Sequence, residues 1–299
     1  MFYHSPLSLK HLTGPSHPES VKRYITILDT LREHKIPEVQ IETPCPLKWL
    51  FLCHDRQYVS LVHKICSSLP ENQIAQLPTG DVNVSRHSPL AARAVIACAL
   101  LAADHIIEKK IKRAFILARP PGHHATRSKG MGFCLFNTIA ITARYLQRIH
   151  NIKRIAIIDW DAHHGNGTAS IFENDPSILY TSTHHALAYP GTGQEPTPTN
   201  RPILSRDDLL SFYEHDLPPL IDQFKPEIIL LSCGFDGHML DPLVPLGLHT
   251  EDFATLTKIV VDLAKAYCSG RILSFLEGGY RLQALADSAL AHINASSCN

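Results

Sequence analysis

Residues 155–167 read IAIIDWDAHHGNG and change abruptly from apolar to ionisable side chains. The apolar start is rich in β-branched residues, which is typical of a strand buried on both faces. In open α/β sheets ligands bind at the carboxyl ends of the strands, so we expect the polar residues to reach a binding edge. Asp161 and His163 are two residues apart and point to the same side of extended backbone. A carboxylate oxygen and an imidazole nitrogen placed together suit a divalent metal.

Four other apolar runs of strand length also end in polar or ionisable residues. The clusters that follow them are His123-His124, Ser182–His184, Asp236–Asp241 and Glu277–Tyr280. An isolated Asp-x-His is more often a helix cap beside a structural histidine. Five such strand ends favour one shared site, because the carboxyl ends of parallel strands meet at one edge of a sheet.

Strand and helix patterns alternate along the chain. We expect strands at about 47–54, 114–118, 155–158, 178–183, 228–232 and 272–276. We expect helices at about 18–34, 58–66, 89–110, 136–150, 207–224 and 251–267, and a last helix that closes near 292, whereas 1–17 and 70–88 should be irregular. This alternation predicts one α/β domain over residues 1–299, with three α/β/α layers around a mainly parallel sheet.

Composition limits the class of protein. Lys+Arg and Asp+Glu each number 28 in 299 residues, so the net charge is zero, which argues against direct nucleic-acid binding and a polybasic membrane surface. The eight cysteines form no C-x-x-C pair and several lie in apolar runs, so we expect reduced thiols and a cytoplasmic protein. We also expect no stretch of membrane-spanning length and no signal peptide.

Three of the strand-end residues could hold a metal ion: Asp161, His163 and Asp241. Three protein ligands leave one coordination position open, as in catalytic zinc sites. A divalent ion lowers the pKa of bound water to about 7, which makes hydroxide available at neutral pH.

Two further motifs supply the proton-transfer and hydrogen-bonding groups that hydrolysis by a metal-bound water needs. One or both of His123 and His124, held by a rigid Pro-Pro-Gly turn, could move the proton. Tyr280, after two glycines, could donate a hydrogen bond to a developing oxyanion. The sequence therefore favours metal-assisted hydrolysis.

Together these motifs resemble the zinc-dependent histone deacetylase family. The similar segments are Arg119–Ala125, Gly132–Cys134, Asp159–Gly167, Gly234–Pro242 and Glu277–Tyr280, in the order that the family has them, and His17-Pro18-Glu19 resembles its N-terminal motif. The resemblance covers nearly the whole chain. It implies an arginase/deacetylase-like fold and hydrolysis of an acyl amide to an amine and a carboxylate.

The resemblance also implies roles for the residues of the reaction centre. Asp161, His163 and Asp241 would bind the zinc, with ferrous iron as the alternative ion. His123 and His124 would be the paired general acid and base, and Tyr280 would polarise the carbonyl. Asp159 would be the partner of His123 and, with Ser182, would belong to a monovalent cation site that could hold K⁺. Asn166 stands beside the second histidine where some members have aspartate, so His124 should be less basic here.

A second set of residues would bind the substrate. Phe133 and Tyr189 resemble the aromatic walls of an acyl-lysine tunnel, although the second wall is more often phenylalanine. Asp81 resembles the rim aspartate that holds substrate backbone amides, and the Gly132 carbonyl would accept the substrate N–H. Leu243 stands where a relative specialised for acetylated polyamines would carry an acidic residue.

Four functions were weighed. The favoured one is a deacylase that acts on acyl-lysine, with acetyl-lysine as the first choice, in a protein or peptide. The alternative is an acylpolyamine or other small-molecule amidohydrolase, which the apolar Leu243 disfavours. An arginase-like two-manganese site is disfavoured because Gly165 replaces the last carboxylate of its Asp-x-His-x-Asp motif. A non-catalytic acyl-lysine binding module would be expected to lose a metal ligand or Tyr280.

Structural roles remain open for several of these residues. His184, His185 and Asp236 are as well explained as structural side chains as by a function. Phe133 and Tyr189 could be core aromatics, and Asp81 could be only a turn former. The sequence leaves the oligomeric state and the acyl chain length undetermined.

Overall fold

The computed structural model, which describes residues 1–297, is built on an eight-stranded sheet in which every neighbouring pair is parallel. The strand order is β2-β1-β5-β10-β9-β6-β7-β8. The strands are β1 Phe2–His4, β2 Glu38–Gln40, β5 Arg113–Ile116, β6 Ile155–Asp159, β7 Ile178–His185, β8 Asn200–Ile203, β9 Ile228–Cys233 and β10 Ile272–Leu276. A separate antiparallel hairpin joins β3 Ile74–Gln76 to β4 Asn83–Ser85.

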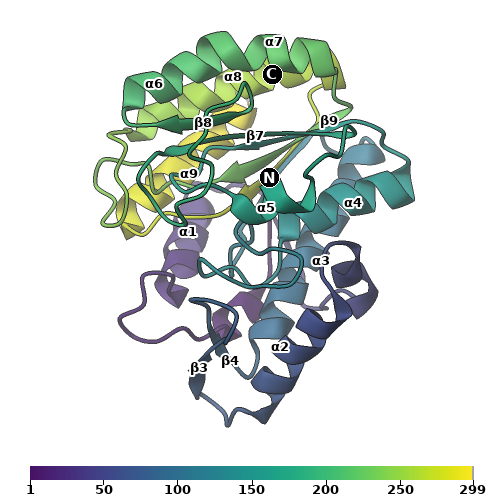
Figure 1. Cartoon of the computed structure of the whole chain (residues 1–299), viewed down its shortest axis with the longest axis vertical. Coiled ribbons are helices and arrows are strands. Elements are labelled where there is room, and N and C mark those ends of the chain that lie inside the picture. The colour runs from purple at the N-terminus through teal and green to yellow at the C-terminus, as the bar shows by residue number, and fades with distance from the viewer. Residues whose placement is uncertain (298–299) are drawn as a thin grey trace.

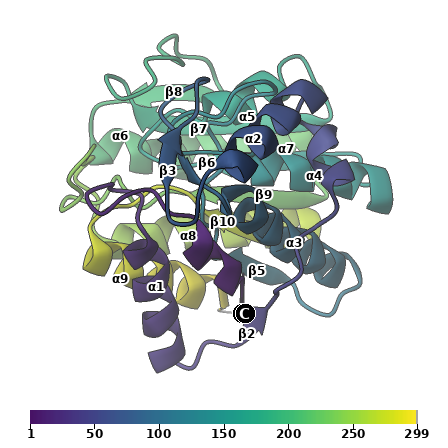
Figure 2. The ribbon, with the colours of Figure 1, turned by 90° about the horizontal axis from the view of Figure 1, so that it is seen from below.

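Helices cover both faces of this sheet. They are α1 Val21–Glu33, α2 Arg56–Ser68, α3 Ser88–Ile107, α4 Thr138–His150, α5 Asn166–Ile171, α6 Arg206–Ser211, α7 Leu217–Phe224, α8 Thr250–Cys268 and α9 Leu282–Ser297. Helices α1, α8 and α9 pack together on one face, and α2, α3 and α4 pack on the other (Figure 2). The predicted three-layer α/β/α fold with a parallel sheet is therefore confirmed.

The central strands are apolar because both of their faces are covered. Every residue of β6, β9 and β10 is buried. Such continuous apolar runs belong to the middle of a parallel sheet. The polar residues that follow these strands therefore stand at one edge of a rigid scaffold.

The short strands were not predicted from the sequence. Strands β1, β2 and β8 have three or four residues each, and β2 and β8 have polar sequences because β2 and β8 lie at the two edges of the sheet. The 70–88 segment contains the β3–β4 hairpin, which Figure 1 shows beside α2 and far from α6 and α7. The strand expected at 47–54 is a 3₁₀ helix, Leu47–Leu52, and its sequence LKWLFL has no β-branched residue.

Helix α3 corrects the expectation about membrane-spanning length. Among the described residues, Ser88–Ile107 is the one helix long and apolar enough to cross a membrane, by length and composition only. It packs against α2 and α4, and 61% of its apolar window is buried inside the protein. The seven described cysteines are free and buried, and Cys298 lies outside the described residues.

Candidate active site

Loops from the carboxyl ends of five parallel strands meet around one cavity of about 280 Å³. The residues that line it are Asp81, His124, Gly132, Phe133, His163, Tyr189, Leu243, Val244 and Tyr280. All five residues predicted to bind substrate are in this lining. The site thus lies where the open-sheet rule predicts.

At the cavity floor, two buried carboxylates converge on one imidazole nitrogen. Nδ1 of His163 lies 3.0 Å from Oδ1 of Asp161 and 2.9 Å from Oδ2 of Asp236. The three ligand atoms lie within 4.8 Å of one another. A buried carboxylate–imidazole–carboxylate group of this kind places metal-binding atoms close together.

Backbone amides hold both carboxylates in place. Asp161 accepts hydrogen bonds from the N–H groups of His163 (2.8 Å) and Gly278 (2.8 Å), and Asp236 accepts one from Ala162 (2.9 Å). A Cβ on Gly278 would lie 2.1 Å from Oδ2 of Asp236, so only glycine allows the β10 loop this close. These contacts orient the carboxylates before any ion binds.

Asp236 is the second carboxylate that contacts His163 in this structure, and the predicted ligand set of Asp161, His163 and Asp241 stays a prediction. The Asp241 carboxylate accepts hydrogen bonds from the N–H groups of Leu243 (2.9 Å) and Tyr280 (2.7 Å). It holds the two loops that carry those residues. Asp236 follows the end of β9 by three residues, much as Asp161 follows the end of β6 by two, so both carboxylates lie at the same edge of the sheet.

The charges around the group favour a cation. Burial raises the pKa of Asp236, and the neighbouring Asp161 carboxylate raises it further. Burial also opposes charge on His163, but hydrogen bonds to Asp161 and Asp236 outweigh it and raise the pKa of His163 to about 11. Two fully buried carboxylates side by side are stable only when positive charge compensates them. The residues present therefore fit a divalent ion.

His123 lies behind the cavity wall, against acidic side chains. Its Nδ1 lies 3.1 Å from Oδ2 of Asp159, and its Nε2 lies 3.8 Å from Oδ1 of Asp161. Burial opposes charge on this ring, but Asp161, Asp159 and Glu277 together raise the pKa of His123 to about 10. The Tyr180 hydroxyl also donates to Oδ2 of Asp159, a partner that the sequence analysis missed.

His124 is the member of the pair that reaches the cavity. Its Nδ1 lies 2.8 Å from Oδ1 of Asn166. Because an amide oxygen can only accept, Nδ1 carries the hydrogen and Nε2 keeps its lone pair. Burial and the neighbouring rings of His123 and His163 hold the pKa of His124 well below its usual value. A neutral imidazole with a free nitrogen can act as a base.

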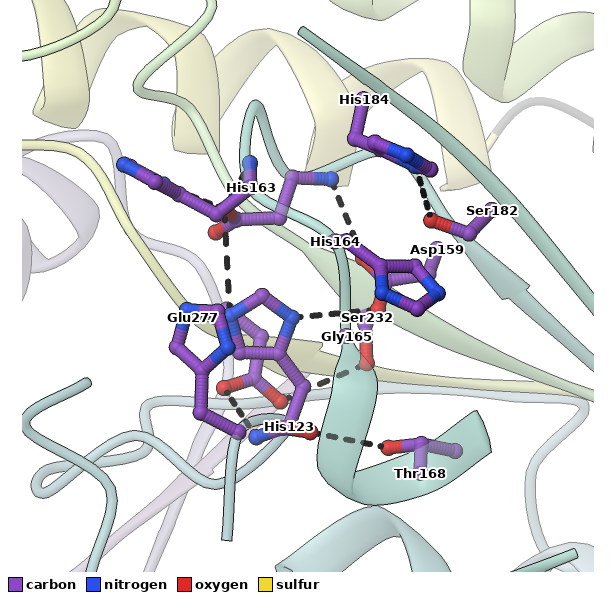
Figure 3. Close-up of polar contacts among 12 residues, drawn as sticks. His123, Asp159, His163, His164, Gly165, Thr168, Ser182, His184, Ser232 and Glu277 are labelled. Atoms are coloured by element: carbon purple, nitrogen blue, oxygen red, sulfur yellow. Dashed lines mark hydrogen bonds and ion pairs between the residues drawn. The ribbon is translucent and has the colours of Figure 1, made fainter. Parts of the chain in front are cut away.

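Glu277 clamps the turn that carries the histidine pair. Its Oε2 accepts hydrogen bonds from the backbone N–H groups of Gly122 (2.7 Å) and His123 (3.1 Å), as Figure 3 shows for His123. Burial raises the pKa of Glu277 to about 7. Glu277 was predicted only to follow the end of a strand, with no role of its own. A buried acid directly after a strand is the signal that could have identified it.

Tyr280 stands over the cavity with its ring held from two sides. Its ring centroid lies 6.1 Å from that of Phe133, and the guanidinium of the buried Arg23 lies 5.1 Å from it. Burial holds the pKa of Tyr280 well above its usual value, so its hydroxyl stays protonated and can donate. Arg23, which donates to the carbonyls of Glu277 and Gly279, was missed because its partners are backbone atoms distant in sequence.

The register of β6 and β7 places Asp159 beside Ser182. The Ser182 hydroxyl lies 2.9 Å from Nδ1 of His184, and the His184 ring lies 4.6 Å from that of His164. Neither histidine lines the cavity. His184 therefore has the contacts of a structural side chain.

Comparison with known proteins identifies the family. Residues 17–296 match the histone deacetylase domain. The chain belongs to the histone deacetylase family. It is 35% identical to histone deacetylase 10, chloroplastic, of Oryza sativa subsp. japonica over 91% of this chain and 68% of that protein. It is 33% identical to a probable deacetylase of Archaeoglobus fulgidus over 92% and 79%.

Other histone deacetylase relatives differ in their named substrates. The chain is 34% identical to polyamine deacetylase HDAC10 of Mus musculus, over 90% of this chain and 43% of that protein. The solved HDA15 HD domain superposes with a TM-score of 0.89 and 28% identity, over 100% of this chain and 91% of that one. Membership of this family makes the chain a hydrolase of the deacetylase class.

Proposed function

We propose that this protein is a zinc-dependent deacetylase that hydrolyses acetyl-lysine in a protein or peptide. The observation that carries the proposal is the cluster of Asp161, His163 and Asp236 at the floor of a cavity that His124 and Tyr280 also line. The Asp241 carboxylate lies beside this cluster and accepts a hydrogen bond from the N–H of Tyr280. A ligand set, a base and an oxyanion donor are thereby within reach of one bound amide.

The ion would be held by Asp161, His163 and Asp241, with the Asp236 carboxylate beside His163. When bound, it supplies positive charge that polarises the substrate carbonyl and lowers the pKa of water. Zinc suits these ligands, and ferrous iron could occupy the same set.

The side chains around the ion perform the proton transfers. His124 accepts a proton at Nε2 from the attacking water while Asn166 holds its Nδ1–H. The Tyr280 hydroxyl donates to the carbonyl oxygen as negative charge develops there. His124 then gives its proton to the leaving amine as the carbon–nitrogen bond breaks. His123, kept charged by Asp159, stabilises the negative charge of the intermediate.

The cavity lining supports a peptidyl substrate. Leu243 and Val244 present an apolar wall where an acidic residue would attract a polyamine. The Phe133 and Tyr189 rings would flank the lysine chain, and the Gly132 carbonyl would accept its amide N–H. The likeness to a polyamine deacetylase keeps acetylated polyamines as the second candidate.

The lack of space for a carboxylate at position 165 disfavours a two-metal, arginase-type reaction. A Cβ on Gly165 would lie 2.2 Å from Oδ2 of Asp159, so a bridging carboxylate could not replace this glycine. We further propose that a monovalent cation such as K⁺ binds near Asp159 and Ser182, and that the protein works in the cytoplasm, where its buried thiols stay reduced.

Acetate release tests this proposal. Metal-free protein is reconstituted with zinc or ferrous iron and given acetyl-lysine peptides, longer acyl-lysine peptides and acetylated polyamines. Metal-dependent turnover of the peptides supports the proposal. Turnover of polyamines alone would reject the peptidyl substrate, and tight metal binding without any turnover would favour a binding module.

A further inference from the structure

One carboxylate ties together three walls of the cavity mouth. Oδ1 of Asp81 accepts a hydrogen bond from the N–H of Gly132 (2.7 Å) and another from the Tyr189 hydroxyl (3.0 Å). These residues come from the β3–β4 turn, the glycine-rich loop before α4 and the loop after β7. We call Asp81, Gly132 and Tyr189 the rim clasp.

The clasp leaves one oxygen of the carboxylate for a ligand. Oδ2 of Asp81 has no hydrogen-bond donor within residues 1–297, and no arginine or lysine of that range forms a salt bridge with Asp81. A carboxylate oxygen has room for further donors beyond those held by its partner oxygen. The free oxygen can therefore accept an N–H from a substrate at the mouth.

The residues at both ends of the rim clasp are held by other contacts. The Tyr189 hydroxyl therefore fixes the orientation of the Asp81 carboxylate. The Thr79 hydroxyl donates to the carbonyl of Gly130 (3.2 Å), which docks the β3–β4 turn on the glycine-rich loop. The Tyr189 ring meets the His124 ring edge-on, with centroids 5.2 Å apart. Tyr189 itself is 39% exposed, so its hydroxyl is at the mouth and not at the reaction centre.

We propose that Tyr189 is a specificity-determining residue that acts through Asp81: its hydroxyl locks the carboxylate so that the free oxygen captures a backbone amide of a peptidyl substrate. A phenylalanine at this position would keep the tunnel wall and lose the lock. The chain would thereby favour an acyl-lysine that carries peptide N–H groups over an acylated amine that carries none. This inference rests on the proposed function.

The test compares wild-type protein with Tyr189→Phe on two acetylated substrates. One is a short acetyl-lysine peptide, and the other is N-acetylbutylamine, which has the same reacting amide and no backbone N–H. The matched control is Tyr267→Phe, which removes a Tyr–Asp hydrogen bond (2.8 Å to Asp222) on the surface of α8.

Tyr189→Phe should raise KM for the peptide about five- to tenfold, as expected for one lost hydrogen bond, and leave kcat unchanged. KM for N-acetylbutylamine should stay unchanged, and Tyr267→Phe should change neither substrate. In an Asp81→Asn background, Tyr189→Phe should add no further effect.

Three outcomes would overturn the proposal. An equal loss with both substrates would mean that the hydroxyl only shapes the tunnel. An unchanged peptide KM would mean that Asp81 needs no lock, and a lowered one would mean that the hydroxyl competes with the substrate. If the wild type hydrolyses neither substrate, the proposed function fails, and the peptide Kd of wild type and Tyr189→Phe, measured by calorimetry, still decides the clasp.

Discussion

Replacing Glu277 by alanine should destabilise the fold and disorder the turn that carries the histidine pair. Oε2 of Glu277 satisfies the buried N–H groups of Gly122 and His123, and Oε1 accepts from the Ser232 hydroxyl at 3.4 Å. An unsatisfied buried donor costs about 1–3 kcal/mol, so two orphaned N–H groups predict a loss of about 2–6 kcal/mol in the free energy of unfolding. His124 follows directly in this turn, so acetate release should also fall.

The assay is urea unfolding of metal-free protein at pH 4.5, where folded Glu277 is protonated, followed by circular dichroism, for wild type, Glu277→Ala and Glu277→Gln. The glutamine amide oxygen can still accept both N–H groups, so Glu277→Gln should stay within about 1 kcal/mol of wild type. If alanine costs less than about 1 kcal/mol, or if glutamine costs as much as alanine, the N–H groups are not what Glu277 stabilises.

Three further predictions concern single groups of the site. Tyr280→Phe should keep the bound metal and lower kcat by about 10²–10³, as for other oxyanion donors, and unchanged turnover would remove this hydroxyl from the mechanism. Gly132→Ala should abolish acetate release, because a Cβ there would lie 2.2 Å from Cδ2 of His124 and the residue has a φ of +53°; a fully active variant would show that the loop can move. The pKa of Glu277 is raised from 4.5 to about 7, so ionisation of its carboxyl opposes folding. Metal-free wild type should therefore lose stability relative to Glu277→Gln as the pH rises from 4.5 through 7. A stability difference that does not change with pH would contradict this.

The fold was predictable because its central strands carry unmistakable patterns. Strands β6, β9 and β10 are continuous apolar runs, and helices separate them in sequence. The edge strands were not predictable, since three or four half-exposed residues carry no periodicity that distinguishes them from a loop.

Site residues that directly follow a strand were predictable from the sequence. The contacts of site residues in a longer loop were not. Asp161 and His163 were found from their spacing after β6. Asp236 and Asp241 lie in one loop after β9, and only the folded backbone shows that Asp236 contacts His163 while Asp241 accepts from the N–H groups of Leu243 and Tyr280. Glu277 and Arg23 act on backbone atoms of distant segments, which no local motif records.

Metal content of two aspartate variants tests the account most directly. Wild type, Asp236→Asn and Asp241→Asn are stripped of metal, reconstituted with zinc and analysed for bound zinc and for acetate release from an acetyl-lysine peptide. We expect about one zinc per chain in wild type, and loss of both zinc and turnover in Asp241→Asn. Asp236→Asn removes a charged partner of His163 and should retain zinc with an affinity lowered about 10–100-fold. Retention of zinc in Asp241→Asn, with loss in Asp236→Asn, would contradict the predicted ligand set.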